Sequence, residues 1–163
     1  MKRIPGVVGI LLLFTACNSG TDRQEQLQTR IDSLQQQLDN SYKPGLGEFM
    51  SGIQVHHAKL WFAGTNNNWK LADFEINEIE ESLEAAQKYC ADRPEVKSIQ
   101  MISPAMDSVK NAVGQQNALL FKSSYILLTN TCNNCHRATQ HEFNVITIPS
   151  APPFTNQSFQ SAR

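Results

Sequence analysis

The apolar residues of this chain recur at spacings of three and four over four long stretches, and this periodicity constrains the fold more than any other feature. The stretches cover residues 46–63, 69–90, 104–113 and 116–138. The breaks between them contain Gly, Asn and Pro, which end helices. Helices joined by short connections pack as antiparallel neighbours, so we predict an all-α fold, an antiparallel four-helix bundle. The pattern of residues 95–102 is ambiguous and predicts no single type of secondary structure.

The same spacing predicts which side chains are buried. The first helix is expected to turn inward Phe49, Met50, Ile53, His57, Leu60 and Trp61. The second is expected to bury Ala72, Ile76, Ile79, Leu83, Ala86 and the free thiol of Cys90, with Glu75, Glu78, Glu80, Glu81 and Glu84 on a solvated face. The last is expected to bury Leu120 and either Ile126 or Leu127.

Composition excludes several classes of protein. The chain has 163 residues, which suits one domain with an appendage. It contains no run of about 18 apolar residues, so no spanning helix is expected. Its formal net charge is −1 and it has no Lys/Arg cluster, so we expect no nucleic-acid partner. It also lacks a Gly-rich phosphate loop and a nucleophile elbow.

The N-terminus has the pattern of an export signal. Lys2 and Arg3 precede the apolar run 6–14, which predicts a signal peptide over residues 1–16. Residues 14–17, Phe-Thr-Ala-Cys, resemble the bacterial lipobox. This resemblance implies that Cys17 is lipidated and becomes the first residue of the mature chain. The protein would then be anchored in the bacterial cell envelope, facing the periplasm or the cell surface; the alternative is a plain secretory signal with an incidental Cys.

Residues 17–45 separate the anchor from the bundle. Residues 18–26 are polar and are expected to form a mobile tether. Leu27, Ile31, Leu34 and Leu38 then follow heptad spacing and predict a short spacer helix, which Lys43–Gly45 ends. Self-association through these four residues, which would make a homo-oligomer, is the alternative.

One motif carries recognisable chemistry. Residues 132–136 read Cys-Asn-Asn-Cys-His, the C-x-x-C-H pattern at which c-type haem is attached. Two thiols at this spacing reach the two vinyl groups of one porphyrin edge, and the His that follows gives a nitrogen to the iron. The motif therefore predicts one haem c, bound covalently by Cys132 and Cys135, with His136 as the proximal iron ligand.

Three other interpretations of the motif stay open. Cys132 and Cys135 form a thioredoxin-like dithiol in the first, although no βαβ pattern surrounds them. The second is a zinc site that adds His136 and His141. The third is a structural disulfide or unmodified thiols.

The motif lies at the C-terminal end of the last of four predicted helices, and in this the chain resembles the cytochrome c-prime class of haem proteins. The resemblance covers residues 46–139, the expected haem-binding bundle, and leaves residues 140–163 as an irregular C-terminal extension. The segments 57–64 and 154–157 also look like those of small exported bacterial haem proteins. The resemblance implies haem binding.

The residue opposite His136 decides the function. The first helix is expected to lie beside the last, which makes His57 a distal ligand or pocket residue, or a hydrogen-bonded core histidine. Met50 is the alternative ligand, or ordinary core packing. Phe49, Trp61 and Phe121 are expected to wall the haem pocket. His56 is expected at the edge of the helix face, near the haem propionates or in solvent, and His141 is expected to cap or pack.

A six-coordinate iron predicts single-electron transfer with redox partner proteins at the membrane. An open distal position predicts instead a binder or sensor of small ligands such as NO or CO. No Arg–His distal pair supports a peroxidase-like enzyme, so no enzymatic activity is expected.

Overall fold

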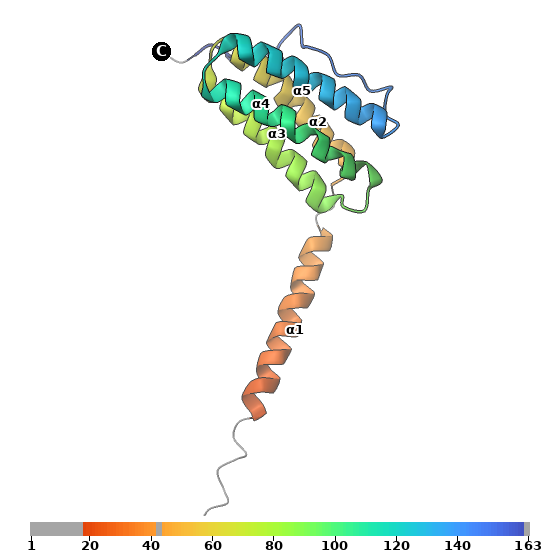
Figure 1. The fold of residues 1–163 in the computed structure, drawn as a ribbon. Coiled ribbons are helices and arrows are strands. Elements are labelled where there is room, and N and C mark those ends of the chain that lie inside the picture. The colour runs from red at the N-terminus through yellow and green to blue at the C-terminus, as the bar shows by residue number, and fades with distance from the viewer. Residues whose placement is uncertain (1–17, 42–43, 162–163) are drawn as a thin grey trace, which may run out of the picture. The chain divides into compact units, whose positions relative to one another are not determined.

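The structure, a computed structural model, describes residues 18–41 and 44–161 (Figure 1). The predicted signal peptide and Cys17 lie outside these residues. The chain divides into two compact units, one up to residue 42 and one from residue 43. Within the described ranges, no helix combines the length and the hydropathy that a bilayer crossing requires.

The described part of the first unit is one long helix, α1 (Asn18–Ser41). The predicted tether over residues 18–26 is therefore wrong, because the helix already includes this stretch. Its second half, residues 23–26, consists of Arg, Gln and Glu, which favour helix nearly as strongly as Leu does. The four heptad-spaced side chains are each more than half exposed: Leu27, Ile31, Leu34 and Leu38.

The second unit is the helical bundle, and the predicted all-α fold is confirmed. Its helices are α2 (Leu46–Thr65), α3 (Trp69–Tyr89), α4 (Ser103–Gly114) and α5 (Ala118–Ala138). Figure 1 shows them side by side, with the chain reversing direction at each connection. Residues 95–102, whose secondary structure the sequence left ambiguous, belong to a 3₁₀ helix, η1 (Pro94–Ile102), that begins at Pro94.

Side-chain caps fix two of the helix starts. Asn68 accepts a hydrogen bond from the backbone N–H of Leu71, as the Asn run before α3 predicts. Asn117 accepts one from Leu120 and begins α5 two residues later than predicted. The delay has a local cause, since Gln116 has a φ of 52° and breaks the helical path.

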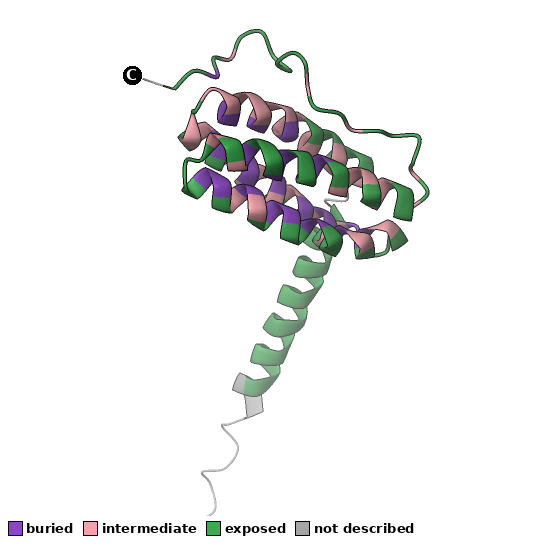
Figure 2. Ribbon diagram, turned by 45° about the horizontal axis from the view of Figure 1, so that its top comes forward, coloured by how far each residue is buried: buried purple, intermediate pink, exposed green. Residues whose placement is uncertain are grey.

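The inward face of α5 differs from the prediction. Phe121, Tyr125 and Leu128 are buried, whereas Ile126 and Leu127 are about half exposed. The aromatic rings therefore set the rotation of α5. Phe121 fits because Gly64 has no side chain, and a Cβ at that position would lie 2.2 Å from the Phe121 ring. Figure 2 shows the buried faces of the four helices turned toward one another.

Glu75 was predicted on a solvated face and is instead fully buried, so this part of the prediction is wrong. His56 Nδ1 lies 2.7 Å from Glu75 Oε2, and Lys59 Nζ lies 3.6 Å from Glu75 Oε1. Both side chains come from α2, and Lys59 supplies a positive charge near the buried carboxyl group on α3. His56 accordingly joins α2 to α3 rather than facing a cofactor or open solvent.

The C-terminal extension is irregular, as predicted, and follows the outside of the bundle (Figures 1 and 2). Its far end is fixed to the core, because Phe159 is only 6% exposed and packs on Phe62. Asn68 Nδ2 donates a hydrogen bond to the carbonyl of Gln160. The extension is therefore part of the folded unit.

Candidate functional site

The C-x-x-C-H motif occupies the last turns of α5. Cys132 and Cys135 continue the inward stripe of Tyr125 and Leu128 at spacings of four and three, so both thiols turn toward the interior. His136, one residue on, is partly exposed. Helix geometry thus brings the two thiols and the imidazole to one end of the bundle.

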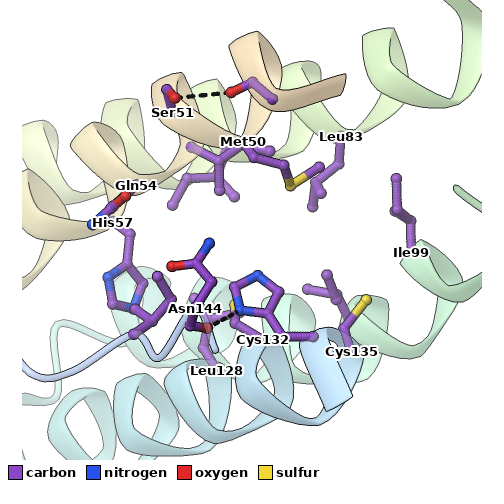
Figure 3. Close-up of a pocket in the computed structure, with 16 residues that line it drawn as sticks. Met50, Ser51, Gln54, His57, Leu83, Ile99, Leu128, Cys132, Cys135 and Asn144 are labelled. Carbon is purple, nitrogen blue, oxygen red and sulfur yellow. Dashed lines mark hydrogen bonds between the residues drawn. The ribbon is translucent and has the colours of Figure 1, made fainter. Parts of the chain in front are cut away.

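A cavity of about 290 Å³ adjoins these residues (Figure 3). Side chains from α2, α3, η1 and α5 line it, together with two residues that follow α5. The apolar part of the lining consists of Met50, Ile53, Ile79, Leu83, Ile99, Ile102, Leu128 and Ile146. Cys132, Cys135, His136 and His57 also line it. All five predicted site residues of the bundle therefore meet at one apolar cavity.

The predicted aromatic wall is wrong. Phe49 stacks against Tyr89, and Trp61 packs on Tyr125 and Phe121, all outside the lining. Aliphatic side chains form the wall instead, because Phe49 packs between α2 and α3 and the other two rings pack between α2 and α5.

His136 is held by a backbone carbonyl. Its Nδ1 lies 2.5 Å from the carbonyl oxygen of Asn144. A carbonyl can only accept, so Nδ1 carries the proton and donates. In the neutral imidazole the lone pair is then on Nε2. A His that binds a metal through one ring nitrogen usually donates a hydrogen bond from the other, as Nδ1 of His136 does here.

Both thiols are protonated at neutral pH. Burial, with a smaller contribution from Cys135, raises the pKa of Cys132 to about 12, and burial also raises the pKa of Cys135. A reactive dithiol needs a lowered pKa instead, so this environment disfavours the thioredoxin-like interpretation. Cys132, Cys135 and Cys90 are free thiols, and Cys90 Sγ donates to the carbonyl of Pro44.

The zinc interpretation finds no support either. No cluster of three or more His, Cys, Asp or Glu side chains suited to a metal ion occurs in the part of the chain that the structure describes. His141 turns back on its own chain, with Nδ1 2.7 Å from the carbonyl oxygen of Thr139, and its ring packs on Phe143. This agrees with the capping and packing role predicted for it.

His57 lines the cavity, and both of its ring nitrogens have protein partners. Nε2 lies 2.9 Å from the hydroxyl of Thr129, and Nδ1 lies 2.9 Å from the hydroxyl of Tyr125. Burial lowers the pKa of His57 to about 4, so the ring is neutral at pH 7. This geometry favours the hydrogen-bonded core histidine over the distal iron ligand.

Met50 extends from α2 across the cavity from Cys132 and Cys135 (Figure 3). Its sulfur is the only thioether among the lining atoms. A thioether needs no hydrogen-bond partner in an apolar cavity and is a known axial ligand of haem iron.

Sequence reasoning missed four residues of the site. Tyr125 and Thr129 hold His57, and their positions seven and three before Cys132 were the available signal. Asn144 and Asn133 gave no such signal, because Asn144 and Ile146, the partner of Asn133, lie in an irregular segment without periodicity.

Comparison with protein-family models, with curated proteins and with solved structures finds no match for the chain. The resemblance to the cytochrome c-prime class therefore rests on the motif and the helical architecture.

Proposed function

We propose that this protein is an exported c-type cytochrome that carries one covalent haem and transfers single electrons. Cys132 and Cys135 would hold the haem through thioether bonds, and His136 would ligate the iron through Nε2. The observation that carries the proposal is the meeting of both thiols and this fixed imidazole at one apolar cavity.

The residues present fit the group chemically. When bound, haem supplies an iron centre that changes by one electron. The chain's own part is to anchor the group, orient its proximal ligand and exclude water. The aliphatic lining, with residues such as Ile53, Leu83 and Leu128, provides the low-dielectric surroundings that tune a haem potential.

Met50 is the residue that we propose for the sixth position. The hydrogen bonds of His57 leave none of its nitrogens free, whereas the thioether of Met50 faces the cavity without a competing partner. If His136 and Met50 both held the iron, no position would remain for substrate, which suits a carrier that works with redox partner proteins at the membrane.

Binding of NO or CO is the second candidate function. The observation in its favour is that the α2 side of the cavity offers no other free ligand once His57 is hydrogen-bonded to α5. If Met50 only packs, the distal position is open to a small ligand.

Covalent haem is tested by maturing the protein in a bacterial host with haem-attachment machinery. We expect one haem per chain by mass spectrometry, retained after acid acetone, and lost in the Cys132→Ser/Cys135→Ser double variant. Cys90→Ser is the matched control, because this buried thiol bonds to Pro44 outside the cavity lining, and it should keep the haem. A colourless wild type with an intact disulfide or bound zinc would overturn the proposal.

A further inference from the structure

Asn133, the first residue between the two Cys of the motif, pairs with the backbone of the C-terminal extension. Its Nδ2 donates to the carbonyl of Ile146, and its Oδ1 accepts from the N–H of the same residue, both at 2.8 Å. An amide side chain offers one acceptor and a donor in the spacing that a backbone unit needs. We call this pair of hydrogen bonds the Asn133 clamp.

The clamp lies two residues from the partner of His136. Asn144 supplies the carbonyl that accepts from His136 Nδ1, and Ile146 is the residue that the clamp holds. Two residues of extended chain span about 7 Å, so fixing Ile146 restricts where the Asn144 carbonyl can lie.

Burial alone holds this segment weakly. Phe143 is 80% exposed and Val145 is 65% exposed, while Ile146 is partly buried against the cavity. Before Asn144, the segment is held by the N–H of His141, which donates to the carbonyl of His136 at 2.7 Å. The Asn133 clamp is the matching attachment after Asn144.

We infer that Asn133 is a positioning residue for the iron ligand: by holding Ile146 it keeps the Asn144 carbonyl on His136 Nδ1 and the ligating lone pair on Nε2. This inference rests on the proposed function. A hydrogen bond at Nδ1 strengthens the imidazole as a donor to iron and favours the oxidised metal. Loss of the clamp should therefore weaken the iron–His bond and raise the reduction potential.

The test compares Asn133→Ala with Asn134→Ala. Both change one Asn between the Cys residues and leave C-x-x-C-H intact, but Asn134 bonds only to Arg137 on the exposed side of α5. In the haem-loaded protein, we expect Asn133→Ala to raise the reduction potential. Asn134→Ala should leave the reduction potential at the wild-type value. Equal values in the two variants would overturn the inference.

A second measurement uses the haem-free full chain, so that it does not depend on haem attachment. The ¹⁵N shifts of His136 should report the Nδ1–H tautomer in the wild type and in Asn134→Ala, and a shift toward Nε2–H in Asn133→Ala. The Ile146 amide should exchange about tenfold faster or more once the clamp is lost. Unchanged tautomer and exchange in Asn133→Ala would overturn the clamp, whereas failure of the wild type to take up haem would reject the proposed function.

Discussion

His57 shows how the chain satisfies a buried imidazole with hydroxyl groups. The hydroxyl of Tyr125 also lies 2.8 Å from the carbonyl of His57, and that of Thr129 lies 2.9 Å from the carbonyl of Tyr125. These contacts and the two ring contacts need four protons, but two hydroxyls and a neutral ring supply only three. One of the four contacts, at the ring or at a carbonyl, is therefore without a proton at any one time.

The neutral state of His57 makes stability depend on pH. Its pKa is lowered from an ordinary 6.5 to about 4, so the unfolded chain binds more protons between these values. The contribution of neutral His57 to the free energy of unfolding is therefore complete above pH 6.5. It is lost as the pH falls to about 4, and the loss is about 3 kcal/mol. We expect the free energy of unfolding, measured by urea titration, to fall less in His57→Gln than in the wild type over this range. A difference that does not change with pH would show that His57 is held in another state.

Spectra of two conservative variants test the assignment of the sixth position. Met50→Leu keeps the volume but removes the sulfur, so it should convert a low-spin iron to high spin and increase CO binding. His57→Gln should leave the spin state unchanged. The reverse result would make His57 the distal ligand, and a wild type that is already high-spin and binds CO would favour the gas-binding function.

At the scale of elements, the contact between α2 and α5 depends on one glycine. Gly64→Ala would place a Cβ 2.2 Å from Phe121, which the packed core cannot accommodate without movement. We expect a loss of about 1–3 kcal/mol in unfolding free energy, seen as a lower melting temperature. Gly52, in the same helix, has no atom within 4 Å of such a Cβ, so Gly52→Ala should stabilise the protein by about 0.5–1 kcal/mol. Equal effects of the two substitutions would contradict the packing argument.

The helices show what the sequence can predict and what it cannot. Spacing and caps placed α2, α3 and α4 within a few residues, because hydrophobic periodicity and Asn68 act locally. The rotation of α5 was mispredicted, since Phe121 and Tyr125 compete with the Leu and Ile residues for the interior and packing decides. Glu75 was mispredicted because its partners come from another helix.

The candidate site also contains residues that the sequence predicted and residues that it could not predict. Cys132, Cys135 and His136 were found from their spacing, and Met50 and His57 from their shared helix face with the expected order of helices. The partners of His57 and His136 depend on contacts between residues 8 to 72 positions apart. No periodic pattern in a single sequence reports such contacts.

At the scale of the whole molecule, export and anchoring stay predictions that depend on Cys17. Cys17→Ser should leave the protein unprocessed or soluble after cell fractionation, because the acyl chains expected on Cys17 would hold the protein at the membrane. The matched control is Cys90→Ser, which should remain in the membrane fraction. Unchanged fractionation of Cys17→Ser would count against the lipobox.

Helix α1 contributes its own length to the segment that would connect a lipid anchor at Cys17 to the bundle. As a helix, its 24 residues extend about 36 Å along their own axis, whereas a flexible chain of that length would average about 27 Å and fluctuate. The exposed heptad-spaced side chains on α1 also keep self-association open as a property to measure by analytical ultracentrifugation.

The bonds between α5 and the C-terminal extension change where the functional unit ends. A protein cut after Ala138 would keep every helix that the structure describes and the whole C-x-x-C-H motif, and its four-helix bundle would still be complete. It would lack the Asn144 carbonyl and the cavity wall at Ile146, and it would expose the site that Phe159 covers on Phe62. A shortened version for crystallisation, or a transplant of the motif into another bundle, therefore has to carry residues 139–160 with it.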